Sequence, residues 1–507
     1  MKNLTVKIFV GLFVVATVLL QSCKKDSETY SFLLNERGAF VEEPGGTTSL
    51  GFTAINISSV TPTTVPQGWS VTVDMNERRI SVTAPTTFPD DPKTLADGEE
   101  EEEENTNVRF GTVYLTGRSS GGSSVSTSLY VSLAETVDLT GQPSNCYIIN
   151  KSNARYCIDV TRKGEDTEAT MSPASVAILW ETPYKVIEFP KLVDGKAYFY
   201  HAIGTDDDEK EFFNHGNALL GAFDAAGNLL WSWHLWCAEF DPADEQVELG
   251  GEVMMKRNLG AGVVSGTSEE DILASYGVYY QWGRKDPFPG TTAFTIMNED
   301  YTYEVDGEPE VYGIDNRVLP KFGLTAEFHG TIEKSIQNPA VFYAMTYKHT
   351  GVEDEYGEEI VENDYKTGDW VDVSNDDYWG GESRKKTIYD PCPVGYKVPV
   401  CDADGNTPYA WLVYTAGKWD EANRGFEQEG QWFPTTGTRA YASGGLDYTE
   451  ANPYSGLWIG TKGKALDNLE LYPDLYGQYM FIIDSKRMLK VSKDKRSQGM
   501  SLRCVKE

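Results

Sequence analysis

Few residues in this chain could perform catalysis, and their spacing fits no common catalytic motif. The chain contains no His-Glu-x-x-His pair and no cysteine–histidine cluster with zinc-binding spacing; its histidines are His201, His215, His234, His329 and His349. Gly117–Gly121 matches the Gly-x-Ser-x-Gly pattern, but that nucleophile needs a strand-to-helix elbow, and another strand pattern follows here. We therefore expect a hairpin loop at this position, no catalytic residue, no metal site and no cofactor.

Aromatic side chains could perform a different kind of chemistry, because their ring faces can stack on sugar rings. Trp231, Trp233 and Trp236 crowd one short run, which is either a stacking platform or a strand buried on both faces; we favour the buried strand. Trp379, Trp432 and Trp458 each lie within two residues of a glycine or proline, in a loop-like context. We take these last three as candidate ligand contacts, with a place in the core as the alternative.

Acidic residues dominate the charge of the chain, which has a formal net charge of −33. Such a surface repels phosphate backbones, so nucleic acid is not expected as a partner. Glu99–Glu104 is a run of six adjacent carboxylates. A calcium loop needs ligands at defined alternating positions with turn glycines, and a uniform run predicts a solvated loop instead.

The amino terminus has the pattern of a segment that is removed on export. Lys2 and Lys7 precede an uncharged, largely apolar run, Ile8–Leu20, which is too short to cross ~30 Å of hydrocarbon as a helix. Leu20-Gln21-Ser22-Cys23 then resembles the bacterial lipobox, in which the chain is cut before the cysteine and acyl chains are attached to it. This resemblance implies a signal peptide over 1–22 and a membrane partner reached through lipid on Cys23.

A polar tether is expected over 23–30, because Lys24–Glu28 cannot enter a bilayer. It resembles the short export signals that send lipoproteins of Bacteroides-like bacteria to the outer face of the outer membrane. No later apolar run is long enough to cross a membrane, and the remaining length predicts two to four domains.

Short alternating runs separated by turn residues predict an antiparallel β-sandwich over 31–137. The predicted strands are 49–54, 69–74, 79–84, 109–115 and 128–133, with Pro62, Pro66, Pro85 and Pro89 between strands. The pattern, with Pro66 to Trp69, resembles BACON-like and other immunoglobulin-like modules. A second β-rich module is expected over 138–250, with a hairpin formed by 217–223 and 229–236.

Four blocks of the last half, in this order, resemble the Fibrobacter succinogenes major paralogous domain: Val253–Ala261, Tyr276–Asp286, Lys386–Pro399 and Ser501–Val505. That family is similar to the C-type-lectin-like fold shared with formylglycine-generating enzymes. The resemblance implies an irregular α+β head over 251–507 with long loops and ends that meet. Those enzymes use a close cysteine pair late in the chain, and Cys392 and Cys401 lie in a different motif, so their activity is not expected. The predicted fold class is therefore mainly β and multidomain.

Cysteines other than Cys23 can form disulfides in an exported chain. The head resemblance implies a Cys392–Cys504 disulfide, because both residues lie in the motif blocks and the ends of such a head meet. Two separate buried thiols are the alternative. Pairing among Cys146, Cys157, Cys237 and Cys401 is left open by the sequence.

These features predict an outer-membrane lipoprotein, displayed on the cell surface, that binds or adheres without catalysis. Its expected ligand is a glycan or a host or partner protein, bound by the lectin-like head. An accessory or tip subunit of a fimbria-like fibre, with fimbrial subunits as partners, is the alternative. A glycan-acting hydrolase is more remote, because no carboxylate pair stands out among so many acidic residues.

Overall fold

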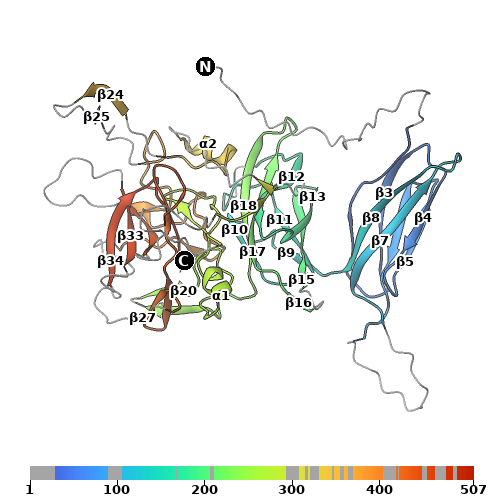
Figure 1. The fold of residues 1–507 in the computed structure, drawn as a ribbon, viewed down its shortest axis with the longest axis horizontal. Helices are drawn as coiled ribbons and strands as arrows, with labels where there is room; N and C mark the ends of the chain where they lie inside the picture. Colours follow the sequence, from blue (N-terminus) through green and yellow to red (C-terminus); the bar gives the residue numbers. More distant parts are fainter. Residues whose placement is uncertain are drawn as a thin grey trace, which may run out of the picture. The chain divides into compact units, whose positions relative to one another are not determined.

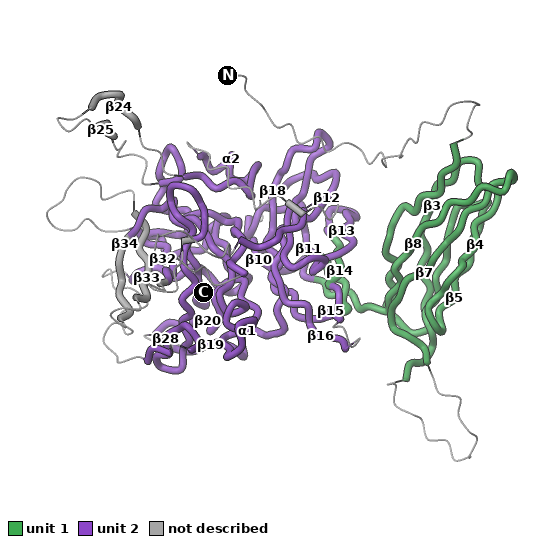
Figure 2. Tube along the Cα trace, viewed as in Figure 1, with its two compact units in different colours: residues 1–138, 153–157, 198–201 green, residues 139–152, 158–197, 202–507 purple. Residues whose placement is uncertain are grey.

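The computed structural model describes 29–89, 106–166, 168, 170–205, 210–249, 251–292, 308–313, 318–319, 330–344, 348–353, 359–362, 369–402, 418–420, 422–447, 454–462, 476–483 and 488–507. Cys23 and Glu99–Glu104 lie outside these residues. The fold is mainly β and divides into two compact units (Figures 1 and 2). The first unit comprises 1–138, 153–157 and 198–201, and the second comprises 139–152, 158–197 and 202–507. Within the described residues, no helix is long and apolar enough to cross a membrane.

Two four-stranded sheets form the sandwich of the first unit. One sheet has the order β1 (Ser31–Leu34), β3 (Thr47–Ile55), β6 (Arg79–Thr83) and β5 (Ser70–Asp74). The other has the order β2 (Gly38–Val41), β8 (Ser124–Leu133), β7 (Phe110–Arg118) and β4 (Ser59–Thr64). Strand β2 runs parallel to β8, whereas β1 runs antiparallel to β3. The strand order is that of an immunoglobulin-like sandwich, as predicted.

Alternating side chains build an apolar core between these sheets. Leu50 and Phe52 of β3 face Val113 and Leu115 of β7 across a cluster of buried hydrophobic residues. The five predicted strands are all present, and Gly117–Gly121 covers the end of β7 and the start of the hairpin turn that leads to β8. The placement of Pro62 between strands was wrong. Pro62 lies within β4, an edge strand whose register shifts there, so its missing N–H removes no bond from the centre of a sheet.

The largest sheet of the second unit contains the predicted Trp-rich hairpin. Its order is β10 (Cys146–Ile149), β18 (Leu229–Cys237), β17 (Gly216–Phe223), β12 (Ser175–Thr182), β22 (Val311–Tyr312) and β23 (Val318–Leu319). Strands β17 and β18 pair antiparallel. Trp231, Trp233 and Trp236 are buried on both faces of β18, so they belong to the core and form no stacking platform.

The expected boundary at residue 250 does not separate two folding units. Strand β22 comes from beyond it and pairs with β12. One core cluster joins Cys146 and Trp236 from before residue 250 to Leu259 and Trp282 after it. The six-stranded sheet and the predicted head therefore fold as one body, because the sheet buries its Trp-rich strand with apolar groups supplied by the later segment.

Most of the remaining elements have two to seven residues, and three strands near the end of the chain have eight or nine. They are β9 (Thr136–Asp138), β11 (Ala154–Asp159), β13 (Ile187–Val193), β14 (Lys196–His201), β15 (Ile203–Thr205), β16 (Glu211–Phe213), β19 (Gln246–Leu249), β20 (Glu252–Met255), α1 (Glu269–Ala274), β21 (Tyr280–Gln281), α2 (Ile332–Gln337), β24 (Lys348–Glu353), β25 (Glu359–Glu362), the 3-10 helix η2 (Gly381–Ser383), β26 (Tyr396–Lys397), β27 (Lys418–Asp420), β28 (Gly425–Gln428), β29 (Gln431–Pro434), β30 (Thr438–Arg439), β31 (Leu446–Asp447), β32 (Tyr454–Lys462), β33 (Tyr476–Ile483), β34 (Met488–Lys495), β35 (Gly499–Met500) and β36 (Val505–Lys506).

The two ends of the head lie side by side. Met254 of β20 pairs with Val505 of β36, and β26 pairs with the same strand. Beside them Cys392 and Cys504 are joined by a disulfide with an S–S distance of 2.02 Å, which closes a separation of 112 residues. The other described cysteines, Cys146, Cys157, Cys237 and Cys401, are buried and are not disulfide-bonded.

Candidate functional site

A three-stranded sheet near the end of the chain sorts its side chains onto two faces. Strands β27, β28 and β29 pair antiparallel, with Lys418 opposite Glu427 and Glu427 opposite Trp432. The alternate residues Trp419, Phe426 and Phe433 oppose one another and pack into a buried cluster. Since successive side chains point to opposite faces of a strand, Lys418, Asp420, Glu427 and Trp432 share the other face.

The indole of Trp432 lies directly over Gly425. A Cβ atom at Gly425 would come within 2.2 Å of Cζ2 of Trp432, so a larger residue there would displace the ring. Gly425 pairs with Pro434 on β29, two residues from Trp432, which is the diagonal spacing that large rings span across strands. Because Gly425 has no side chain, the half-buried indole can pack directly against the backbone there.

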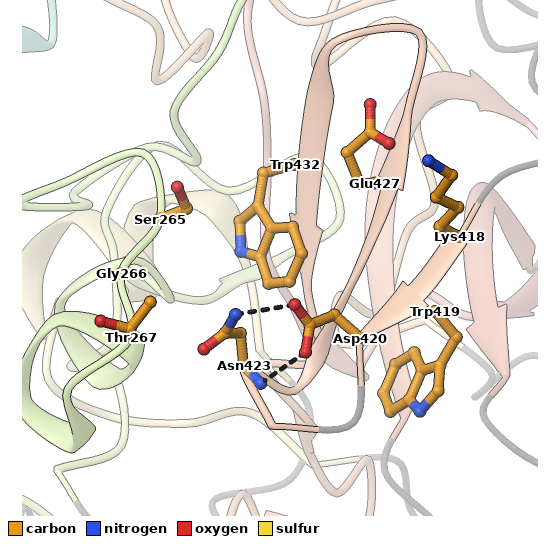
Figure 3. Close-up of a pocket in the computed structure, with 9 residues that line it drawn as sticks. All are labelled: Ser265, Gly266, Thr267, Lys418, Trp419, Asp420, Asn423, Glu427 and Trp432. Atoms are coloured by element: carbon orange, nitrogen blue, oxygen red, sulfur yellow. Dashed lines mark hydrogen bonds between the residues drawn. The ribbon is translucent and has the colours of Figure 1, made fainter.

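The turn between β27 and β28 brings an acid and an amide beside this indole (Figure 3). Asn423 donates its backbone N–H to Oδ1 of Asp420 at 3.1 Å and its side-chain N–H to Oδ2 at 2.7 Å. The next turn consists of Glu429 and Gly430, both at positive φ, as a two-residue hairpin requires. There Gly430 donates its N–H to Glu427 at 3.1 Å.

A loop from a distant part of the chain forms the opposite wall. Ser265, Gly266 and Thr267 precede α1, whose N-cap Ser268 accepts the N–H of Asp271 at 3.1 Å. A Cβ atom at Gly266 would lie 1.9 Å from Cβ of Asp271, so this close approach of loop to helix requires glycine. The loop therefore holds a defined position in front of the three-stranded sheet.

The two walls enclose an open pocket of about 540 Å³. Its volume lies within the ~300–1,000 Å³ that is usual for small-molecule sites. We call it the hairpin pocket; it is lined by Ser265, Gly266, Thr267, Lys418, Trp419, Asp420, Asn423, Glu427 and Trp432 (Figure 3). One aromatic face and several hydrogen-bonding groups converge there, so the pocket can hold a ligand that has an apolar face and polar edges.

Two buried arginines from the motif blocks bind the backbone of the sheet wall and of the segment that leads into the loop wall. Arg503 donates to the backbone oxygen of Trp432 at 2.8 Å and to Oε1 of Gln431 at 3.0 Å, and its guanidinium lies 4.6 Å from the Phe433 ring centroid. It also donates from Nε and Nη2 to Oδ1 of Asn258. Arg503 thus fixes the backbone that carries the indole.

Arg257, next to Asn258, binds the segment that leads into the other wall. It donates to the backbone oxygen of Gly262 and, at 2.7 Å, to Oε1 of Glu245. Arg257, Asn258 and Arg503, which belong to two of the four motif blocks, therefore lie behind the pocket, while the pocket itself is lined by residues outside all four blocks.

Two of the three candidate ligand contacts are wrong. Trp379 and Trp458 are 1% and 0% exposed and belong to the same core cluster as Trp282. Trp458 donates its ring N–H to the backbone oxygen of Tyr280 at 2.8 Å. A glycine near a tryptophan allows close packing against the backbone in the core as well as in a loop. A neighbouring glycine or proline therefore does not distinguish a buried tryptophan from one that contacts a ligand. Of the three, only Trp432 lines the pocket.

A cysteine, a histidine and an asparagine come together in the core with the connectivity of a cysteine protease. Sγ of Cys146 lies 3.5 Å from Nδ1 of His234, and Nε2 of His234 lies 2.8 Å from Oδ1 of Asn217. Asn217 donates its own side-chain N–H to Gly260, so its oxygen faces the imidazole and the ring proton belongs on Nε2. Nδ1 then accepts from Cys146 or from the hydroxyl of Tyr280 at 3.2 Å.

Burial makes this cluster structural. Cys146 and His234 are each 1% exposed. Burial raises the pKa of the Cys146 thiol and lowers the pKa of His234 to about 3, so the thiol stays protonated and the imidazole stays neutral. A reactive cysteine needs a thiolate that a substrate can reach. Sequence spacing could not have revealed this cluster, because its members are far apart in the chain.

Ser232, Lys285 and Asp286 form a second buried polar cluster. Lys285 donates to Oδ1 of Asp286 at 2.6 Å and to Oγ of Ser232 at 2.7 Å, and its ammonium lies 4.4 Å from the Trp231 ring centroid. Burial lowers the pKa of Lys285 to about 8. All three side chains are closed to solvent, so this cluster also belongs to the core. Among the described residues, no group of three or more His, Cys, Asp or Glu side chains could hold a metal ion.

Comparisons with known proteins add little to this picture. No protein-family model and no curated protein matches the chain. Among solved structures, the chain is similar to Bacteroides ovatus mixed-linkage glucan utilization locus SGBP-B in complex with mixed-linkage heptasaccharide, at 11% identity over 40% of this chain and 43% of that chain, with a TM-score of 0.12.

Adhesion ectodomains give similar values. The human desmocollin-1 ectodomain matches at 12% identity over 42% of this chain and 41% of that chain, with a TM-score of 0.15. The protocadherin gamma B7 domains 1–4 match at 10% identity over 42% of this chain and 51% of that chain, with a TM-score of 0.14. The match thus spans about half or less of each neighbour. Similarities at these TM-scores carry no functional weight, so the function is inferred from the residues of this chain.

Proposed function

We propose that this chain is a cell-surface binding protein, anchored in the outer membrane by lipid on Cys23, that holds its ligand in the hairpin pocket without catalysis. The observation that carries the proposal is the position of Trp432, whose half-buried indole lies over Gly425 inside an open pocket. An aromatic anchor surrounded by polar groups is the usual centre of a recognition surface. A glycan or a host or partner protein is the ligand class that such a surface fits.

The binding test uses the full chain on an array that carries both glycans and host extracellular proteins. Trp432→Ala is expected to abolish the signal of the bound spots, because it removes the aromatic anchor. Tyr114→Ala is the matched control, since Tyr114 is an exposed ring (52%) in the sandwich, outside the pocket. Binding that survives Trp432→Ala, or that is lost equally with Tyr114→Ala, would refute the pocket as the binding site.

The same array separates binding from hydrolysis. Asp420 and Glu427 both line the pocket, and a carboxylate pair is the usual apparatus of glycoside hydrolysis. If the pocket binds without catalysis, each bound glycan should be recovered uncleaved. Cleavage that stops in both Asp420→Asn and Glu427→Gln would replace the binding role with a hydrolase.

The anchor is tested in cells. A radiolabelled fatty acid is expected to label the wild-type chain, and Cys23→Ala should remove the label because no other lipobox cysteine is present. Protease added to intact cells should then remove the pocket-bearing unit. A head that is protected from protease would place the protein on the periplasmic side of the membrane.

A further inference from the structure

We infer that the ligand of the hairpin pocket is a neutral glycan, with one pyranose ring stacked on Trp432 and two adjacent hydroxyls held by Asp420 and Asn423. This inference rests on the proposed function and narrows it to one ligand class. Three independent features of the pocket carry it, namely the fixed indole, the acid–amide pair and the charge around them.

The indole is held in place before any ligand arrives. The ring packs against the backbone at Gly425, and the backbone oxygen of Trp432 accepts a hydrogen bond from the buried Arg503. Strand pairing with Glu427 fixes the residue from the side. A pyranose presents an apolar C–H face and polar edges, and a preorganised ring binds such a face with little loss of conformational freedom.

The acid–amide pair fits a pair of neighbouring hydroxyls. Both oxygens of Asp420 accept from Asn423, yet each carboxylate oxygen has a second lone pair for a hydroxyl donor. The amide of Asn423 has a second N–H, which can donate to a hydroxyl oxygen. One hydroxyl can therefore donate to Asp420 while its neighbour accepts from Asn423, and a protein backbone offers no such pair of adjacent hydroxyls.

The charge of the pocket favours a neutral ligand over an anionic one. Asp420 and Glu427 carry two negative charges, against one positive charge on Lys418. The whole chain adds a formal net charge of −33, which repels anions as they approach. A uronate or sulfate placed on the indole would be repelled by the two carboxylates, whereas a neutral sugar carries no charge for them to repel.

Pairs of oligosaccharides that differ only in charge test this inference. The full chain is titrated with neutral gluco-, manno- and xylo-oligosaccharides, and with oligogalacturonate in its free and methyl-esterified forms. We expect binding to at least one neutral probe, and weaker binding to free than to esterified oligogalacturonate. Trp432→Ala and Asp420→Asn should each weaken neutral binding by about tenfold or more, as truncation of an interface anchor does. Trp432→Phe should retain part of the affinity, and Tyr114→Ala should retain all of it.

The outcomes distinguish this inference from the proposed function. Binding only to anionic glycans or only to proteins, lost with Trp432→Ala, would overturn the neutral-glycan inference and leave the pocket as the binding site. The inference is also overturned if no neutral probe binds at millimolar concentration, or if Asp420→Asn has no effect. Binding that is unchanged in Trp432→Ala would overturn the proposed function itself.

Discussion

The immunoglobulin-like sandwich and the pocket-bearing unit provide hydrogen-bond partners for their buried backbone groups in different ways. In the sandwich, two regular sheets satisfy the backbone polar groups, and the core between them consists of apolar side chains. The second unit contains sheets too, but much of its chain lies in short strands and loops, and four of its largest fully buried side chains are arginines: Arg284, Arg439, Arg496 and Arg503. Buried arginine is rare, so its role needs an explanation.

The arginines supply donors where the loops lack strand partners. Arg284 donates to the backbone oxygens of Val341 and Pro339, and Arg439 donates to those of Gly444 and Pro289. Carboxylates balance part of the charge, with Arg439 paired to Glu308 and Arg496 paired to Asp369. Because a buried carbonyl without a partner is costly, such donors help an irregular segment to be buried. The difference teaches that the second unit adds a few long-range polar and covalent links to its apolar clusters, whereas the core of the sandwich is built from apolar side chains.

The disulfide gives the largest test of that difference. Replacing both Cys392 and Cys504 with alanine should lower the free energy of unfolding of the second unit by ~4–5 kcal/mol, from the loop-entropy relation for a 112-residue span. Hydrogen exchange resolved by peptide reports the two units separately. Cys237→Ala is the control, because it removes a buried sulfur without removing a crosslink. A non-reducing peptide map without the Cys392–Cys504 crosslink would contradict the assignment.

Arg503 gives the next largest effect. Arg503→Met leaves the acceptors of Asn258, Gln431 and Trp432 without their donor, and should cost the second unit roughly 3 kcal/mol. Leu129→Ala, in the sandwich core, should cost ~2–5 kcal/mol through lost packing and should act on the first unit. If Arg503→Met lowered hydrogen-exchange protection in the sandwich, the result would contradict the claim that Arg503 stabilises only the second unit.

His234 should make the second unit sensitive to acid. Its folded-state pKa is about 3, below the unfolded value near 6.5, so its contribution is present above pH 6.5 and is lost as the pH falls toward 3. The free energy of unfolding of the wild type, relative to His234→Gln, should fall by about 1.4 kcal/mol for each pH unit below 6.5. Denaturant titrations from pH 6.5 to 5 measure this difference, and a flat difference would show that His234 is protonated in the folded state.

Gly425 gives the smallest change in stability and the clearest effect on the pocket. Gly425→Ala should displace the Trp432 indole and weaken ligand binding about tenfold, while stability changes by only about 1 kcal/mol. Gly430→Ala is the matched control. Its Cβ would meet no atom within 4 Å but would be strained at φ +72°, so stability should fall while affinity stays unchanged. Equal losses of affinity in the two variants would contradict the claim that packing of the indole on Gly425 positions Trp432 for binding.

The same contrast explains what could be predicted from the sequence. Period-two alternation predicted β3, β5, β6, β7 and β8, and two pairs among them, β5–β6 and β7–β8, form hairpins. Strand β4 was missed because Pro62 interrupts its pattern, and β1 and β2 because each has only four residues. Short alternating runs alone do not carry enough pattern to stand out.

The candidate site was only partly predictable. Trp432 was chosen for its context, and the same rule chose the buried Trp379 and Trp458. A better signal was present in Gly425–Pro434, where Glu429-Gly430 predicts a two-residue hairpin turn that places Trp432 opposite Glu427. The wall formed by Ser265–Thr267 could not be predicted, because it reaches the hairpin through contacts between residues far apart in the chain.

Fluorine NMR of the full chain labelled with fluorotryptophan tests the central claim most directly. The chain has 12 tryptophans, and Trp432→Phe identifies the Trp432 resonance by its loss. When the best-binding oligosaccharide is added, the Trp432 resonance should shift most and that of Trp419, at the pocket edge, should shift less. The resonances of Trp379 and Trp458 should stay in place, because these side chains are buried. A Trp432 resonance that does not move at saturating ligand would contradict binding in the hairpin pocket.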